Sequence, residues 1–279
     1  MINLSICSPV LKVDKYAVEL SGSLKRLRND GLRFEHVVVG PACNSNEVAE
    51  VFGHLDSSFC VEKLGTRGVF DAVAQGFTYA IFNWAPTHLS YINADDLLEP
   101  GFARALAACR GDENQLITGD VQWIGEHGQS FGKVSTWPWQ FGTGALFEAG
   151  VPALTQQGTI LSASVWQSVD GFDPNYKYIA DSVLWHKLIR EKRVQRTHVR
   201  KCVASYRMRS GQLSGNREAV EAEQHIWELK MKGQFAPIWQ RNLAVAFMKL
   251  YFAPRYAQRL LNGRILRTKV AMKSGGFSK

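Results

Sequence analysis

Two adjacent carboxylates, Asp95 and Asp96, are the residues whose position most directly predicts chemistry. They follow the apolar residues 88–92, which have the pattern of a buried strand. Neighbouring carboxylates can hold a hard divalent cation, and such a cation can in turn bind a diphosphate. The alternative is structural, because the pair stands shortly before Pro100 and can cap a helix that begins at Gly101.

Three further charged residues lie near predicted helix starts. Arg67 and Asp71 flank the start of a helix near Gly68, and a helix N-terminus favours anions. The alternative for these two residues is a surface charge pair across one turn. Asp181 directly precedes the predicted helix 182–191, a position that is typical of an N-cap.

The elements that must position these residues alternate between strands and helices over the first hundred residues. Apolar residues recur at helical spacing over residues 17–27 and 69–80. This alternation predicts an α/β fold with a mostly parallel sheet that is covered by helices on both faces. Such sheets bind ligands at the carboxyl ends of their strands, so the loops after Cys7, Val39 and Ile92 are candidate binding loops. The strands expected here are residues 4–7, 36–40, 59–61 and 88–92.

The second part of the chain is less regular. We expect strands at residues 116–121 and 159–162, and two edge strands at 194–199 and 203–207. From Arg217 onward the pattern is helical, with breaks at Gly233 and Pro254. Five tryptophans lie in the middle of the chain, and each can pack against a sugar ring or in the core. They are Trp123, Trp137, Trp139, Trp166 and Trp185.

The composition excludes several classes of protein. With 46% hydrophobic and 21% charged residues, the chain has the composition of a globular enzyme. Its five cysteines form no C-x-x-C pair, which indicates reduced thiols in a cytoplasmic protein and no zinc site. No histidine pair has metal-ligand spacing, and no serine stands in a G-x-S-x-G setting. No apolar run is long enough to span a bilayer, and we expect no signal peptide.

The net charge of +8 comes from the end of the chain. Residues 1–228 hold 22 Lys+Arg against 25 Asp+Glu, whereas residues 229–279 hold 11 Lys+Arg and no acidic residue. A slightly acidic body disfavours nucleic-acid binding. Residues 236–279 alternate apolar and cationic positions, which predicts an amphipathic helical tail. The tail can lie on a membrane surface, pack on the body, or join two copies into a homo-oligomer.

An ordered series of motifs runs along residues 2–215. It begins with T-R-G-V-F-D-A-V-A-Q-G at 66–76 and Y-I-N-A-D-D-L-L-E-P-G at 91–101. It continues through I-T-G-D-V at 117–121, Q-G-T at 157–159, G-F-D at 171–173, A-D at 180–181 and G-Q-L-S at 211–214. This series resembles glycosyltransferase family 2. The resemblance implies a GT-A fold, a Rossmann-like mostly parallel sheet flanked by helices, with a C-terminal helical extension.

The resemblance also implies a division of the chain. Residues 1–215 would form the glycosyltransferase domain, with a nucleotide-binding half at 1–100 and an acceptor half at 101–215. Residues 216–279 would form the basic amphipathic helical tail.

The same resemblance implies roles for the candidate residues. Asp95 would face the donor ribose or the metal, and Asp96 would coordinate Mg²⁺ or Mn²⁺, which neutralises charge on the leaving nucleoside diphosphate. Asp181 would be the general base that takes the proton of the acceptor hydroxyl. The other nucleotide-sugar-binding positions would be Ser8 and Pro9 at the nucleobase, Arg67 at the nucleotide or diphosphate, Asp71 at the rim, and Asn93.

The chain departs from the family pattern at several positions. Residues 40–46 lack the Asp that contacts the nucleobase in many relatives, which leaves Asn44, Asn46 or backbone groups for that role. Ala74 stands in place of a usual Asn, and Gln156 in place of a usual His. These departures bear on the choice of donor more than on the fold.

The expected function is the metal-assisted, inverting transfer of a sugar from a nucleotide-sugar to a hydroxyl of a glycan or lipid-linked acceptor. A UDP-sugar is the first candidate donor, and polysaccharide or lipopolysaccharide assembly is the expected context. The expected location is the cytoplasm, with the inner face of the membrane reached through residues 236–279. The alternative is a non-catalytic binding protein for nucleotide-sugars or glycans on the same fold.

Overall fold

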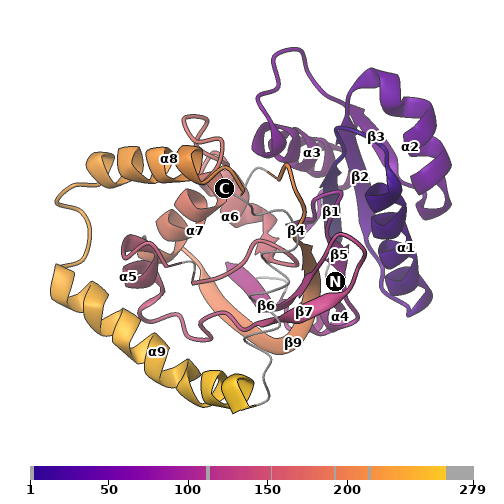
Figure 1. The fold of residues 1–279 in the computed structure, drawn as a ribbon. Coiled ribbons are helices and arrows are strands. Elements are labelled where there is room, and N and C mark those ends of the chain that lie inside the picture. Colours follow the sequence, from indigo (N-terminus) through magenta and orange to yellow (C-terminus); the bar gives the residue numbers. More distant parts are fainter. Residues whose placement is uncertain (1–2, 111–113, 152, 192, 213–214, 262–279) are drawn as a thin grey trace.

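The structure is a computed structural model that describes residues 3–261 except 111–113, 152, 192 and 213–214. Within these residues, one sheet of nine strands runs through the molecule with helices against it (Figure 1). The strand order is β3-β2-β1-β4-β8-β6-β9-β5, and β7 pairs with β6. The elements are β1 (Leu4–Pro9), α1 (Lys15–Asn29), β2 (Glu35–Gly40), α2 (Ser45–Phe52), β3 (Ser58–Val61), α3 (Val69–Trp84), β4 (His88–Tyr91), β5 (Leu97–Leu98), α4 (Gly101–Ala107), β6 (Gln115–Ile124), β7 (Ser130–Val134), α5 (Thr143–Glu148), β8 (Ile160–Ser162), α6 (Ala163–Ser168), α7 (Ala180–Arg190), β9 (Gln195–Arg207), α8 (Arg217–Lys230) and α9 (Ile238–Leu261).

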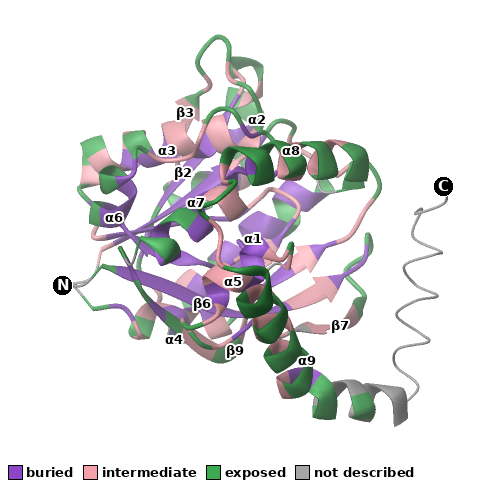
Figure 2. Ribbon diagram, turned by 90° about the vertical axis from the view of Figure 1, so that its left-hand side faces the viewer, coloured by how far each residue is buried: buried purple, intermediate pink, exposed green. Residues whose placement is uncertain are grey.

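The first four long strands are parallel, as the alternation of strands and helices predicts. β2 and β4 flank β1, and β3 lies beyond β2. Alternate residues of β1 enter opposite cores: Ile6 belongs to the cluster that contains α1 and α2, and Cys7 to the cluster that contains α3. Both side chains are buried, and Figure 2 shows most of the neighbouring strand β2 as buried as well. The carboxyl ends of β1, β2 and β4 therefore meet at one edge of the sheet.

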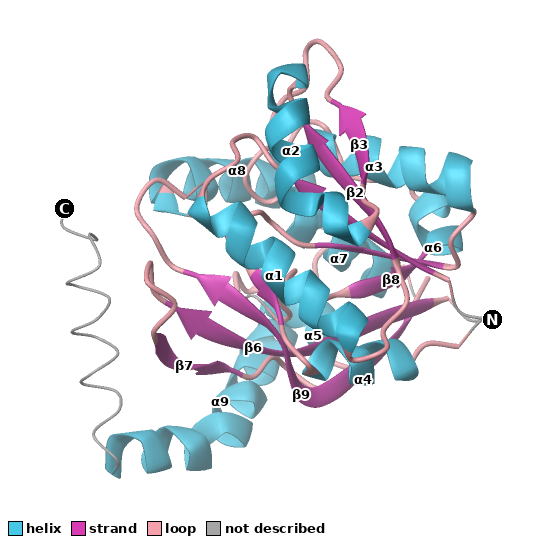
Figure 3. Ribbon diagram, turned by 90° about the vertical axis from the view of Figure 1, so that its right-hand side faces the viewer, coloured by secondary structure: helices cyan, strands magenta, loops and turns pink. Residues whose placement is uncertain are grey.

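The second half continues the same sheet with mixed strand directions. β8 is antiparallel to both β4 and β6, and β9 runs parallel to β6 (Figure 3). The prediction of two edge strands at 194–199 and 203–207 was wrong, because β9 is one strand and lies between β6 and β5. Its register against β6 shifts around Asp120, where Gly119 pairs with Val199 but Val121 pairs with Ala204. This irregularity interrupts the alternation that marks a single strand in sequence.

The tail begins as two helices that pack on the body through part of their surface. Trp227 of α8 and Phe252 of α9 belong to the main core cluster. The predicted break at Gly233 is confirmed, since it lies between the helices, but Pro254 lies inside α9. Pro254 is exposed, so water can bond the carbonyl that its missing N–H leaves unpaired. Predicted tail positions after residue 261 lie outside the described residues.

The start of α9 is tied to α5 and α7 by the buried carboxylate of Glu148. It accepts a hydrogen bond from the Ala236 amide at 2.6 Å and lies 3.0 Å from His186 Nε2 and 3.3 Å from Arg190 Nη1. The guanidinium of Arg241 donates to the Glu148 carbonyl at 3.0 Å. No helix in the described part of the chain is both long and apolar enough to span a membrane.

The close crossing of α3 over β1 depends on Gly76. A Cβ atom at this position would lie 2.4 Å from Cys7 Sγ and 2.8 Å from Val39 Cγ2. We expect Gly76→Ala to lower the free energy of unfolding by about 1–3 kcal/mol, because α3 would have to move away from the sheet. Urea denaturation measures this change.

The matched control is Gly22→Ala in α1, where the nearest atom to an added Cβ is Arg26 Nη1 at 4.0 Å. Alanine favours a helix, so this variant should gain up to about 1 kcal/mol. Equal losses in both variants would contradict the role assigned to Gly76.

Candidate active site

Asp95 and Asp96 lie in a tight loop at residues 92–96, the acidic loop, which leaves the carboxyl end of β4. The Asp96 amide donates to the Asn93 carbonyl at 3.0 Å, and the Ile92 amide donates to the Cys7 carbonyl at 3.0 Å. The loop is therefore closed on itself and attached to the adjacent strand β1. The residues that follow it form β5, which pairs with the last part of β9. This pairing brings the end of β9 to the two carboxylates.

The side chain of Asp96 points into the protein. It is fully buried, and its two oxygens accept hydrogen bonds from the Arg207 amide at 2.8 Å and from Gln157 Nε2 at 3.2 Å. Burial raises the pKa of Asp96 well above its usual range, and the nearby charge of Asp95 raises it further. Metal coordination by Asp96 stays a prediction, whereas its observed contacts fasten the acidic loop to β9.

The side chain of Asp95 points toward the surface. Its Oδ2 accepts hydrogen bonds from Arg209 Nε at 2.8 Å and from Gln212 Nε2 at 3.2 Å. The guanidinium groups of Arg207 and Arg209 lie 4.9 and 5.3 Å from the centre of the Tyr16 ring. Of the two carboxylates, Asp95 is thus the one that a ligand can reach, and a cation already contacts it.

Arg207 is the last residue of β9 and has no exposed surface. Its guanidinium donates to the carbonyls of Asp95 at 2.8 Å and of Gly125 and Glu126 at 3.1 Å each, and it pairs with the carboxylate of Glu19. One side chain therefore joins the acidic loop, α1 and the turn after β6.

Asp181 lies in the first turn of α7, and its Oδ1 accepts a hydrogen bond from the Ser182 amide at 2.7 Å. Burial raises its pKa to about 6. The buried hydroxyl of Tyr91 has no hydrogen-bond partner among the described residues. Burial, and after it the charges of Asp181 and Asp96, raise the pKa of Tyr91. Tyr91 ends β4 directly before the acidic loop, and it belongs to the same core cluster as Ala180, the residue that precedes Asp181.

The N-terminal end of α7 is held by α8. The carboxylate of Glu223 accepts hydrogen bonds from the amides of Lys177 and Tyr178 at 2.7 Å each and from the Ile179 amide at 3.1 Å. These amides directly precede the helix that carries Asp181. A carboxylate at this end also interacts favourably with the helix dipole.

Arg67 and Asp71 lie at the start of α3, as predicted. Asp71 Oδ2 accepts a hydrogen bond from the Arg67 amide at 2.9 Å and lies 3.8 Å from Arg67 Nε. The Arg67 side chain is 71% exposed. Lys177, from the segment before α7, passes beside Gly68. Two cationic side chains thus lie near this helix N-terminus, an arrangement that suits a phosphate.

Ser8 and Pro9, which were predicted to contact the nucleobase, lie partly in the protein core. Ser8 is fully buried, and its Oγ lies 3.0 Å from His36 Nε2, while Ser57 Oγ lies 2.6 Å from His36 Nδ1. Burial lowers the pKa of His36 to about 3, so the imidazole is neutral. The half-buried Pro9 ends the strand. The buried Asn93 Oδ1 has no hydrogen-bond partner among the described residues, so this atom can accept a bond from a ligand or water.

The side chains present fit a divalent metal poorly. Among the described residues, no group of three His, Cys, Asp or Glu side chains is placed to hold a metal ion. Asp96 is enclosed, and Asp95 bonds to Arg209 through Oδ2. The candidate oxygen ligands that remain are Asp95 Oδ1 and Asn93 Oδ1.

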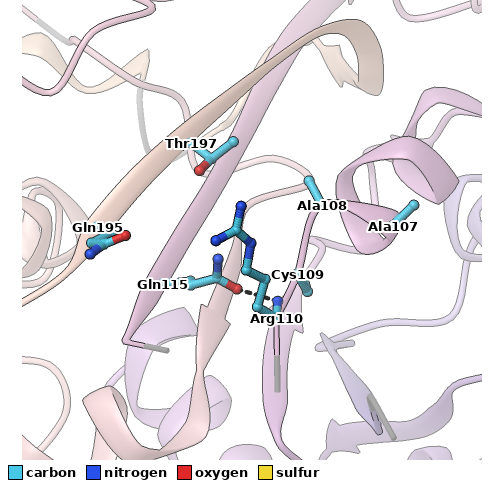
Figure 4. Close-up of a pocket in the computed structure, with 7 residues that line it drawn as sticks. All are labelled: Ala107, Ala108, Cys109, Arg110, Gln115, Gln195 and Thr197. Carbon is cyan, nitrogen blue, oxygen red and sulfur yellow. Dashed lines mark hydrogen bonds between the residues drawn. The ribbon is translucent and has the colours of Figure 1, made fainter. Parts of the chain in front are cut away.

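A cavity of about 310 Å³ lies where β6 and β9 begin, beside the end of α4 (Figure 4). Its lining includes Gln115 and Gln195, which begin β6 and β9. The acidic loop contacts the opposite end of β9, so this cavity is not part of the candidate active site.

Four residues that organise the site have no predicted role: Tyr91, Gln157, Arg207 and Arg209. Arg207 and Arg209 do carry a signal, since they alternate at the carboxyl end of a predicted strand and so share one side of it. Nothing in the sequence indicates which carboxylates they meet.

No protein-family model and no curated protein matches the chain. Among solved structures, the chain is similar to S. aureus TarS in complex with UDP-GlcNAc, with 13% identity, 90% of this chain and 73% of that chain covered, and a TM-score of 0.57. It is similar to the mannosyltransferase PcManGT from Pyrobaculum calidifontis in complex with GDP-Man and Mn²⁺, with 14% identity, 99% and 75% covered, and a TM-score of 0.58.

A third similar structure is glucosyl-3-phosphoglycerate synthase from Mycobacterium tuberculosis in complex with Mn²⁺, UDP and phosphoglyceric acid. Here the identity is 17%, 80% of this chain and 78% of that chain are covered, and the TM-score is 0.53. Likeness at such identities concerns the fold. The chain has the GT-A-type fold of these glycosyltransferases, which confirms the predicted fold class.

We expect Arg207→Gln to lower the free energy of unfolding by about 3 kcal/mol, because buried acceptors lose their donor. Arg209→Gln removes a half-exposed ion pair and should cost less than about 1 kcal/mol. Urea denaturation of both variants checks the difference. An Arg207 variant as stable as the Arg209 variant would contradict the central role of Arg207.

Proposed function

We propose that this protein is a family 2 glycosyltransferase that moves a sugar from a nucleotide-sugar, first a UDP-sugar, to a hydroxyl of a glycan or lipid-linked acceptor. Transfer inverts the configuration at C1. The proposed context is polysaccharide or lipopolysaccharide assembly in the cytoplasm or on the inner face of the membrane.

One observation carries this proposal. On a GT-A-type fold, the acidic loop directly follows Tyr91 at the end of β4, and Tyr91 packs in the same core cluster as Ala180, the neighbour of Asp181 at the start of α7. The start of α3, with Arg67 and Lys177 beside it, offers a position for the anionic donor. A donor held between α3 and the acidic loop would present C1 toward Asp181.

Asp181 supplies the base in this mechanism. As the acceptor oxygen bonds to C1 and the bond from C1 to the diphosphate oxygen breaks, Asp181 takes the hydroxyl proton. A carboxylate whose pKa is raised to about 6 accepts a proton more readily than an ordinary aspartate, yet it remains largely ionised at neutral pH. The resemblance also implies Mg²⁺ or Mn²⁺ at Asp95 and Asp96, but the hydrogen bonds that these two side chains already make fit a divalent ion poorly, so no step of this mechanism depends on a metal.

We expect Asp181→Asn to reduce kcat by about 10²–10⁴-fold, because an amide cannot accept the proton. In the wild type, activity should rise with pH through about 6 and then level off, since the base must be deprotonated. Release of nucleoside diphosphate from a panel of nucleotide-sugars with a glycan acceptor measures both effects.

Asp170→Asn is the matched control, because Asp170 is exposed and its φ of 57° suits asparagine. Unchanged turnover in Asp181→Asn would remove Asp181 from the mechanism. Nucleotide-sugar binding without any turnover by the wild type would favour the non-catalytic binding protein instead.

We also propose that α9 lies on an anionic membrane surface. Its inner side packs on the body through residues such as Val245 and Met248, yet a second apolar set faces solvent. This exposed set comprises Ile238, Trp239, Leu243, Phe247 and Leu250. Residues 229–279 contain no acidic residue, so their charge complements anionic lipid.

We expect Phe247→Glu to weaken binding to phosphatidylglycerol vesicles by about tenfold or more. The aromatic ring that would be buried among the lipids is replaced by a negative charge, which the anionic headgroups repel. Vesicle co-sedimentation measures the effect. Phe82→Glu is the control, since Phe82 is a still more exposed phenylalanine on α3. Equal binding of both variants, or equal binding to neutral phosphatidylcholine, would contradict membrane contact through α9.

A further inference from the structure

Arg209 already supplies a positive charge where the sequence predicts a divalent cation. Its Nε donates to Asp95 Oδ2 at 2.8 Å, and Gln212 donates to the same oxygen at 3.2 Å. The Arg209 side chain is 32% exposed, against 14% for Asp95. The guanidinium therefore stands between the acidic loop and solvent.

The position of Arg209 is fixed by more than this ion pair. Its guanidinium and that of Arg207 both lie against the Tyr16 ring, whose hydroxyl donates to Glu126 Oε1 at 3.0 Å. Cation–π contacts of this kind favour a defined position for the cation. Arg207 is enclosed and bonds to protein acceptors, so Arg209 is the member of the pair that a ligand can reach.

The arrangement opposes a divalent ion at the same place. Mg²⁺ requires close to six oxygen ligands, and Asp96 keeps both of its oxygens bonded within the protein. An ion bound to Asp95 would have to displace Arg209 or lie beside a guanidinium, and like charges at such distances repel. The side chains fit a resident guanidinium better than a resident metal.

We infer that Arg209, in place of a divalent cation, neutralises the diphosphate of the donor during sugar transfer. This inference rests on the proposed function. As the bond from C1 to the diphosphate oxygen breaks, its electron pair stays on that oxygen, to which the guanidinium donates hydrogen bonds. The acceptor oxygen forms the new bond to C1, and its proton goes to Asp181. An Arg side chain stays charged and can bond two phosphate oxygens at once.

Asp95 is then a positioning residue. It holds Arg209 through Nε, while Nη1 makes only a long hydrogen bond of 3.5 Å to the Ser210 carbonyl, so the terminal nitrogens keep N–H groups for the phosphate oxygens. Gln212 Nε2 donates to the same oxygen of Asp95 and also to the Arg207 carbonyl. This division of roles does not require Asp96 to turn outward, away from its two hydrogen-bond donors.

The test is calorimetric titration of the full chain with UDP, GDP, CDP and dTDP, each in EDTA and in Mn²⁺. One nucleotide is expected to bind in EDTA with a Kd within about threefold of its value in Mn²⁺. Arg209→Gln should weaken that binding about 10- to 100-fold in both buffers. Arg209→Lys should fall between the two, because it keeps the charge without the fork.

Arg193→Gln is the matched control, because Arg193 is a half-exposed arginine paired with Glu191 ahead of β9, whereas Arg209 lies beyond its end. The Arg193→Gln variant should bind the nucleotide as tightly as the wild type. For Arg209→Gln, a melting temperature close to that of the wild type would show that the variant is folded. Nucleotide binding that requires Mn²⁺ would overturn the inference and leave the proposed function standing. Absence of binding in both buffers would overturn both.

Discussion

The candidate site depends on the hydrogen bonds and the ion pair that the buried guanidinium of Arg207 makes. Removing a charge from water is costly, and the loss is offset here by hydrogen bonds to three carbonyls and an ion pair with Glu19. Because Arg207 ends β9, the acidic loop takes its position from a strand far along the chain. The N-terminal strands alone therefore cannot form the site. The loop, α1 and the second half of the sheet have to assemble together.

Local patterns were sufficient to predict an α/β fold with a mostly parallel sheet, and the resemblance carried by the motif series added the GT-A fold. The parallel strands β1 to β4 are apolar runs between helices, and the helix starts at Gly68 and Gly101 follow from local sequence. The errors occur where local rules compete with pairing. The sequence predicts two edge strands in place of β9 because the register of β9 shifts beside Asp120. It predicts a break at Pro254, but α9 continues through this residue, which faces solvent. Both depend on neighbours that the sequence does not display.

The site was predictable in its residue types and less so in its contacts. Asp95, Asp96 and Asp181 stand out from motifs and strand ends, but their environments do not. That Asp96 faces Gln157 while Asp95 faces Arg209 follows from the way β9 crosses the loop. The resemblance to a metal-using family carries no information about an arginine at this point. The pairing of Asp95 with Arg209 is thus a long-range contact, and the topology of the sheet determines it.

The hydrogen bonds that the amides before α7 donate to Glu223 make α8 a structural part of the region that carries Asp181. Glu148 attaches the start of α9 to α7 in the same way. Residue 215 ends the motif series, yet the two sides of that point share a helix N-terminus and a buried ion pair. A force on the tail would thus reach the helix that carries Asp181. Any contact that displaces α9 would therefore also bear on the placement of that carboxylate.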